Sequence, residues 1–311
     1  MATTVLFPAS LLTDGRAPAS LTELPDVELV IYDDPSRWPD GAEHAQVLVV
    51  GWGDPAPIHP GLGALVGLRL IQVIGAGVEQ WEGQVPDGVL LSNARGAHGG
   101  ATAEWAIAAL LAVVREFPRF VLEQANGEWA PGLTATLVGA RVLVVGAGDL
   151  AAELQRRLSG FDAEVTLVGR TARTSVRPVS ELLGLLPAQD AVVVTVPQTP
   201  DTVGMVDADF LAHMADGAIL VNAARGPIVR TAALLAELTS GRLRAALDVT
   251  DPEPLPPGHP LWEAPGLLLT PHVAGNTEGA TERGLVVIAE QIRQFIAGGT
   301  PANVQSVDGV G

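Results

Sequence analysis

The segment that decides the fold reads Arg141-Val142-Leu143-Val144-Val145-Gly146-Ala147-Gly148-Asp149-Leu150-Ala151. An apolar run typical of a buried parallel strand leads into a Gly-x-Gly-x-x-Ala turn and then into an amphipathic helix. Gly146 permits the tight turn, Gly148 lets a pyrophosphate approach the backbone, and the small Ala151 permits close packing of helix on strand. A phosphate would sit on the amides of the helix N-terminus. The segment predicts a dinucleotide-binding unit, and a purely structural turn is the alternative.

Apolar, β-branched runs recur on both sides of this segment, each followed by a helix-like stretch. Before it they are residues 5–7, 27–32, 47–50, 70–74 and 89–91, and from it onward 141–145, 165–168, 191–196, 218–221, 244–249 and 267–270. Continuous apolar strands that alternate with helices predict parallel sheets covered on both faces. We therefore expect an α/β chain with two doubly wound domains. The first would be flavodoxin-like, and the second a six-stranded Rossmann domain with strand order 3-2-1-4-5-6.

The length of the chain supports two domains. It has 311 residues, about twice a typical domain. Residues 101–117 are expected to form a connecting helix that Pro118 ends. Residues 281–296 predict a second long helix, with apolar residues at spacings of three and four. We expect this helix to return to the first domain, giving boundaries of 1–96 plus 280–311 for that domain and 97–279 for the nucleotide-binding domain.

The composition excludes several kinds of chemistry. The chain has no Cys, and all 18 of its basic residues are Arg. Thiol nucleophiles, cysteine-based metal sites, Schiff bases and P-loops are therefore excluded, and we expect no metal site. The net charge of −17 disfavours nucleic acid and anionic membranes as partners, although it also serves solubility. With no basic leader and no apolar run near the roughly 20 residues of a membrane span, we expect a cytoplasmic protein.

The end of the strand after the glycine turn bears on cofactor choice. In an NAD site an Asp or Glu at that point bonds the ribose 2′-hydroxyl. Here residues 167–173 read Leu-Val-Gly-Arg-Thr-Ala-Arg, with no carboxylate. The guanidinium groups of Arg170 and Arg173 and the hydroxyl of Thr171 suit a 2′-phosphate instead. We therefore expect NADP to be preferred and NAD to be possible. Ordinary solvated arginines at a strand end are the alternative.

Three chemically useful residues follow the last three strands of the second set: Arg225, Glu253 and His272. Ligands of open α/β sheets bind beyond the carboxyl ends of the strands, so we expect the three to form a row. Reduction of a 2-oxo acid needs a cation for the substrate carboxylate, an acid for the developing alkoxide, and a carboxylate that keeps this acid protonated. Arg225, His272 and Glu253 match these needs in that order. Each alone is compatible with an ordinary surface role, but their coincidence behind a nucleotide loop favours a catalytic site.

Several segments in order along the chain make the sequence recognisable. Beside the glycine loop they are LIQVIGAGV at 70–78, ATAE at 101–104, VPQTPDTVG at 196–204, VNAARG at 221–226, LDV at 247–249 with EPLP at 253–256, and TPHVAG at 270–275. With them the chain resembles the D-isomer-specific 2-hydroxyacid dehydrogenases, the glyoxylate/hydroxypyruvate reductases among them, over nearly its full length. Two departures are Ala151 in place of the third loop glycine and Glu79 where the family commonly has Asp.

The resemblance implies a role for each residue of the predicted site. Arg225 would orient the substrate carboxylate and carbonyl, His272 would be the acid/base, and Glu253 its partner. Asp248 would hold the nicotinamide carboxamide. Backbone amides of the first domain would grip the substrate carboxylate, namely those of Gly75, Ala76 and Gly77. The remaining cofactor contacts would come from Thr102, Gly146, Gly148, Asp149, Leu150, Val196, Pro197, Thr202, Ala223 and Gly275.

The resemblance also implies an activity and a partner. We expect an NADP-preferring reductase of a small 2-oxo acid, with Trp52 helping to select the substrate side chain. Glu253 argues against the formate dehydrogenase branch, which has Gln there, and the absence of Lys argues against the phosphite-oxidising branch. Family members are typically homodimers through the nucleotide-binding domain, so residues 128–130 would pack on the partner. The alternative from another class is a nucleotide-sensing, corepressor-like protein with little turnover.

Overall fold

The computed structural model describes residues 2–53 and 56–305. The chain divides into two compact units, one made of Met1–His98 with Glu278–Gly311 and the other of Gly99–Thr277. We call them unit 1 and unit 2. The boundaries expected from the sequence, at 96/97 and 279/280, stay a prediction about which parts of the chain fold independently.

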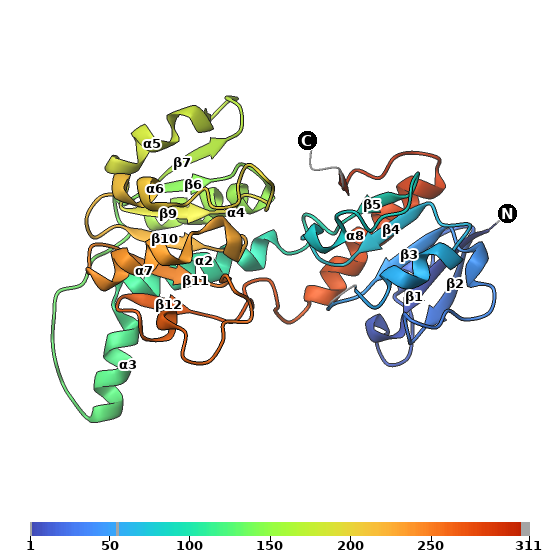
Figure 1. Ribbon diagram of the computed structural model, residues 1–311, viewed down its shortest axis with the longest axis horizontal. Coiled ribbons are helices and arrows are strands. Elements are labelled where there is room, and N and C mark those ends of the chain that lie inside the picture. Colours follow the sequence, from blue (N-terminus) through green and yellow to red (C-terminus); the bar gives the residue numbers. More distant parts are fainter. Residues whose placement is uncertain (1, 54–55, 306–311) are drawn as a thin grey trace. The chain divides into compact units, whose positions relative to one another are not determined.

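Unit 1 contains a six-stranded sheet in the order β13-β5-β4-β3-β1-β2 (Figure 1). The strands are β1 (Thr3–Pro8), β2 (Val27–Tyr32), β3 (Val47–Val50), β4 (Leu70–Val73), β5 (Leu90–Ser92) and β13 (Val304–Gln305). β1 to β5 pair in parallel, and the two-residue β13 is antiparallel to β5. The order 2-1-3-4-5 of the parallel strands is the flavodoxin-like one that the sequence predicts.

Apolar side chains cover both faces of this sheet. On one face α8 (Ala280–Ile296) packs residues such as Leu285 and Ile288 against Val5 and Phe7 of β1, and the short α1 (Ala19–Thr22) contacts α8. On the other face the core includes Trp81 from a short 3-10 helix. Since α8 follows the last strand of unit 2, unit 1 is made of two separate segments of the chain.

Unit 2 contains a seven-stranded sheet in the order β12-β11-β10-β9-β6-β7-β8 (Figure 1). All its pairings are parallel. The strands are β6 (Arg141–Val145), β7 (Glu164–Gly169), β8 (Val176–Pro178), β9 (Ala191–Val194), β10 (Ile219–Asn222), β11 (Arg244–Leu247) and β12 (Leu267–Leu269). The strand order reverses between β6 and β9, which is where a Rossmann sheet binds its ligand.

The sheet of unit 2 differs from the expected six strands in the order 3-2-1-4-5-6, both in the place of β9 and in having a seventh strand. The expected order would place the third apolar run, residues 191–196, at the sheet edge beside β7. Instead β9 pairs with β6 and β10, and β8 takes the edge beside β7. β8 has three residues, of which Arg177 is exposed and Pro178 cannot donate to a ladder. Such an edge strand lacks the continuous apolar run that reveals the buried strands.

Helices cover both faces of the unit 2 sheet. α2 (Gly99–Val114) and α4 (Asp149–Leu158) lie on one face, and α5 (Leu182–Leu185), α6 (Ala208–His213) and α7 (Thr231–Thr239) lie on the other. The expected single helix over 101–117 is wrong at its end, because α2 stops at Val114 and α3 (Phe117–Asn126) follows. Glu116 adopts a left-handed φ of 55°, and Pro118 lies in the first turn of α3, where its missing N–H is harmless.

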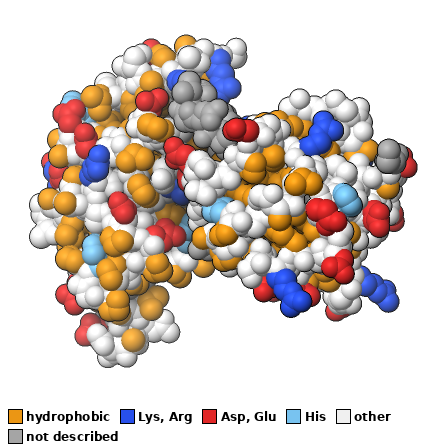
Figure 2. All heavy atoms as spheres, turned by 45° about the vertical axis from the view of Figure 1, so that its right-hand side comes forward, with side chains coloured by type: hydrophobic (Ala, Val, Ile, Leu, Met, Phe, Trp, Pro, Cys, Tyr) orange, Lys and Arg blue, Asp and Glu red, His pale blue; other side chains and the backbone are white. Residues whose placement is uncertain are grey.

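The surface reflects the acidic composition. On the face that Figure 2 shows, carboxylate side chains are dispersed among apolar and uncharged ones and form no single patch. Across residues 2–53 and 56–305, no helix combines the length and apolar character that crossing a membrane requires.

Candidate active site

The glycine turn joins β6 to α4. Gly146 has a φ of +126°, and a Cβ there would lie 2.2 Å from Thr195 Oγ1, so only glycine fits. Gly148 is the N-cap residue of α4, and no side chain caps the helix. A Cβ on Gly148 would meet nothing within 4 Å. The space in front of the helix N-terminus is therefore open to an anionic group, which fits the predicted pyrophosphate contact with Asp149 and Leu150.

The segment after β7 lies against this turn. Arg170, Thr171 and Arg173 are all exposed. Arg173 Nη2 donates a hydrogen bond to the carbonyl of Ala147 in the glycine turn, at 2.7 Å. The structure therefore brings the segment with the predicted 2′-phosphate ligands beside the predicted pyrophosphate site.

The other predicted cofactor residues lie at ends of the same sheet and its helices. Thr202 Oγ1 donates to the Pro197 carbonyl at 2.7 Å and accepts from the Thr199 N–H at 2.8 Å. Its hydroxyl thus shapes the loop after β9, and its contact with a cofactor stays a prediction. Thr102 lies in α2, Val196 follows β9, Ala223 follows β10 and Gly275 follows β12.

Arg225 follows β10 in a loop that is fixed from two sides. Asn222 Oδ1 accepts from the Ala224 N–H at 3.0 Å, and Asn222 Nδ2 donates to the Arg225 carbonyl at 2.9 Å. A Cβ on Gly226 would lie 1.8 Å from the carbonyl oxygen of Thr250, so the loop closely approaches the one after β11. The positioning role of Asn222 was not predicted, although a buried Asn at the end of an apolar strand was a visible signal.

Glu253 and His272 come together after the next two strands of the sheet. His272 Nδ1 lies 2.5 Å from Glu253 Oε1, and Glu253 Oε2 accepts from the Thr250 N–H at 3.4 Å. An ionised carboxylate can only accept, so Nδ1 carries the proton of this bond and Nε2 is left for proton exchange. The side chains of His272 and Glu253 are 48% and 39% exposed. The pair is therefore accessible to a small substrate.

Asp248 lies immediately after β11 and is 3% exposed. Its carboxylate accepts hydrogen bonds from the hydroxyl of Thr270 and from the N–H groups of Val273 and Ala274, at 2.6, 2.9 and 2.8 Å. A carboxylate has about four acceptor positions, so one further donor can be accommodated. The predicted contact with a nicotinamide carboxamide stays a prediction.

The predicted substrate residues of unit 1 lie after β3 and β4. The loop of Gly75, Ala76 and Gly77 is held through its carbonyls, because the Ala94 N–H donates to Gly75 at 2.9 Å and Asn93 Nδ2 donates to Ala76 at 2.7 Å. Trp52 is 51% exposed, and its Nε1 donates to Thr281 Oγ1 of α8 at 3.1 Å. The expectation that this loop and Arg225 grip one carboxylate stays a prediction.

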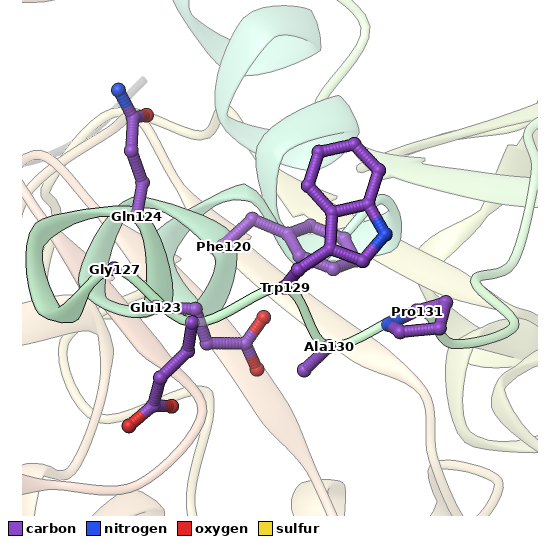
Figure 3. Close-up of a pocket in the computed structure, with 8 residues that line it drawn as sticks. Phe120, Glu123, Gln124, Gly127, Trp129, Ala130 and Pro131 are labelled. Atoms are coloured by element: carbon purple, nitrogen blue, oxygen red, sulfur yellow. The ribbon is translucent and has the colours of Figure 1, made fainter.

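An apolar surface lies on α3 and the segment that follows it. Phe120 of α3, Trp129 and Pro131 line a hollow, and Figure 3 draws the Trp129 ring next to the Phe120 ring. Trp129 is 96% exposed and Leu133 is 100% exposed. We call residues 117–133 the α3 arm. The dimer contact expected at residues 128–130 falls on this arm and stays a prediction.

Comparisons with known proteins agree with this geometry. Residues 107–274 match the model of the NAD-binding domain of D-isomer specific 2-hydroxyacid dehydrogenases. The chain is 32% identical over 310 residues to a D-3-phosphoglycerate dehydrogenase of Mycobacterium bovis, covering 94% of this chain and 57% of that protein. This chain thus spans little more than half the length of that relative.

Two other relatives match over most of their own length. The glyoxylate/hydroxypyruvate reductase A of Serratia proteamaculans is 30% identical, with 87% of this chain and 89% of that protein covered. The crystal structure of a D-isomer specific 2-hydroxyacid dehydrogenase from Xanthobacter autotrophicus, in complex with NADPH and MES, is 30% identical with a TM-score of 0.85, and 98% of each chain is covered. The chain therefore belongs to the D-isomer specific 2-hydroxyacid dehydrogenase family.

Proposed function

We propose that this protein is an NADP-preferring oxidoreductase that reduces a small 2-oxo acid, of the glyoxylate or hydroxypyruvate type, to the 2-hydroxy acid. The observation that carries the proposal is the 2.5 Å contact between His272 Nδ1 and Glu253 Oε1. These two residues follow β12 and β11, and Arg225 follows the neighbouring β10. Membership of the family supports this assignment. The name of the Serratia relative supports the substrate class.

Each residue of the site would have one task. The nicotinamide cofactor supplies the hydride when it is bound. Arg225 holds the substrate carboxylate with a planar guanidinium that can bond both oxygens. His272 gives a proton from Nε2 to the alkoxide that develops on the substrate, and Glu253 stabilises the imidazolium from the Nδ1 side.

The preference for NADP rests on the segment after β7. Arg170 and Thr171 are exposed there, and Arg173 is tied to the glycine turn. A carboxylate would repel the 2′-phosphate, and the segment between β7 and β8 contains none. NADPH in the Xanthobacter structure is consistent with this choice.

Selection of the substrate side chain would fall to Trp52. Its ring lies 5.3 Å from the ring of His98 and is anchored by the bond to Thr281. A large indole held in this way limits the space for a substrate side chain, which favours small acids.

The α3 arm supports a homodimer through unit 2. Phe117, Val121 and Leu122 of α3 are 53%, 62% and 67% exposed, in addition to Trp129 and Leu133. A second copy of this arm would cover these side chains. Sedimentation of the wild type and of a Trp129→Ser variant checks this, and a monomeric wild type would overturn it.

Initial rates with a panel of 2-oxo acids and both reduced cofactors test the whole proposal. We expect turnover of glyoxylate or hydroxypyruvate with NADPH, and weaker turnover with NADH. Tight binding of the nucleotide without turnover of any acid would instead favour the sensor alternative.

A further inference from the structure

His272 has a backbone conformation that residues other than glycine rarely adopt. His272 has a φ of 53°, in the left-handed region. A residue other than glycine stays there only when the surrounding bonds hold it. The reason for this conformation therefore lies in the bonds made by residues 272–274.

Most of those bonds go to a single residue, Asp248, and the N–H of His272 also lies 3.2 Å from the Thr270 carbonyl. The N–H of His272 donates to the main-chain carbonyl of Asp248 at 2.7 Å. The next two N–H groups, of Val273 and Ala274, donate to the Oδ1 and Oδ2 atoms of the same residue. Three successive amides are thus bound by Asp248, and their direction fixes where the imidazole of His272 points toward Glu253.

The hydroxyl of Thr270 fixes the carboxylate in turn. Thr270 is bonded to the neighbouring strand by its N–H, which donates to the Leu247 carbonyl at 2.9 Å, and its Oγ1 donates to Asp248 Oδ1 at 2.6 Å. Rotation of the Asp248 side chain would break this bond and the two loop amide bonds together. Because Asp248 is buried, water cannot easily replace them.

We propose that Thr270 and Asp248 are positioning residues that hold His272 against Glu253, and that their effect on the reaction is exerted through His272. This inference rests on the proposed function, in which His272 is the proton donor. It assigns the buried carboxylate a task that precedes and does not require cofactor binding. The Thr270 hydroxyl bonds Asp248, whereas the bond of Thr270 to His272 uses only the Thr270 carbonyl. A side-chain substitution at Thr270 leaves that carbonyl in place, so we expect the effect of the hydroxyl to pass through Asp248.

The first test compares Thr270→Val with Thr270→Ser. Val keeps the shape of Thr and removes the hydroxyl, whereas Ser keeps the hydroxyl. We expect Thr270→Val to lower kcat about tenfold, as for the loss of one hydrogen bond to a charged group, with less than a twofold change in the Kd of NADPH. Thr270→Ser should restore kcat. The matched control Thr22→Val removes a hydroxyl from unit 1 that bonds the Pro18 carbonyl and should leave kcat unchanged.

A double-mutant cycle identifies the route of the effect. In a His272→Asn background, Thr270→Val should change the residual rate less than twofold, because the group that it positions is gone. A tenfold loss that persists in that background would overturn the proposal. So would a wild-type kcat with a raised Kd of NADPH, which would assign Asp248 and Thr270 to the cofactor alone. If Thr270→Val does not fold, Asp248→Asn in the same cycle takes its place.

A spectroscopic signal separates this inference from the proposed function. The proton between His272 Nδ1 and Glu253 should give a far-downfield NMR resonance in the protein without substrate or cofactor, identified by its loss in His272→Asn. The resonance should persist in Thr270→Ser and shift or disappear in Thr270→Val. If it behaves so while no 2-oxo acid is reduced, the positioning role holds and the proposed reaction fails. An unchanged resonance in Thr270→Val overturns the positioning role.

Discussion

The carboxyl ends of the two parallel sheets use their polar side chains differently. In unit 2 the strand ends present Glu253 and His272 to solvent, while buried Asp248 and Asn222 hold the loops beneath. In unit 1 Tyr32 ends β2, and its buried hydroxyl donates to the Val49 carbonyl at 2.8 Å. The difference fits the proposal that the reacting side chains belong to unit 2, with unit 1 supplying backbone amides and the Trp52 ring.

The largest effect should follow from removal of the proton donor in unit 2. His272→Asn should lower kcat by about two orders of magnitude or more, because no other group then protonates the alkoxide. The Kd of NADPH should not change, since the glycine turn is untouched. Steady-state rates and fluorescence titration with NADPH check both parts, and a kcat within threefold of wild type would remove His272 from the mechanism.

The next effect concerns the cation. Arg225→Lys should lower kcat/KM for the 2-oxo acid by about ten- to a hundredfold, because a point charge cannot reproduce the planar fork. The loop itself should persist, since the bonds of Asn222 go to backbone atoms. Kinetics of the variant at saturating NADPH test this. Near-normal KM and kcat would show that Arg225 does not hold the carboxylate.

A smaller effect is expected for cofactor choice. NADPH should be favoured over NADH by at least about tenfold in kcat/KM, since one charge-assisted hydrogen bond contributes about 1.5–3 kcal/mol. Arg170→Ala should remove most of this preference through the KM for NADPH and leave the NADH kinetics nearly unchanged. Equal kcat/KM values for the two cofactors in the wild type would make Arg170 an ordinary solvated residue.

The smallest effect concerns stability in unit 1. Tyr32→Phe should lower the free energy of unfolding by about 1 kcal/mol, because the Val49 carbonyl loses its partner. Burial raises the pKa of Tyr32 above its usual value. Above about pH 10 the unfolded chain therefore ionises this group and the folded chain does not. Wild-type stability should fall there, and the Phe variant should lack this decline. Urea denaturation at two pH values measures both, and parallel curves would contradict the assignment.

The sequence predicted best those features that only particular residue types can form. The glycine turn could be predicted because Gly146 has no alternative at its φ and beside Thr195. The row of strand-end residues could be predicted because β10, β11 and β12 each contain a run of three apolar residues. Their order in the sheet followed from a general rule.

Other features gave no such signal. β8 is an edge strand without an apolar run, and β13 pairs through only two residues. Pro118 alone does not show whether a helix ends or begins there, because proline ends a preceding helix and also fits the first turn of a new one. The left-handed backbone of Glu116 separates α2 from α3 and gives Pro118 the second role. The sequence did not indicate Thr270 as a site residue, because its proposed role depends on a hydrogen bond to the Asp248 carboxylate, 22 positions away along the chain.

The turnover of the Glu253→Gln variant tests the central claim most directly, namely that His272 and Glu253 act as one acid. Glu253 Oε1 accepts the Nδ1 proton of His272, and the uncharged amide of Gln cannot replace this charge-assisted bond when the ring is an imidazolium. The kcat of reduction should therefore fall by about tenfold or more in Glu253→Gln, with the Kd of NADPH unchanged. A kcat within twofold of the wild-type value would contradict the pairing that the 2.5 Å contact indicates.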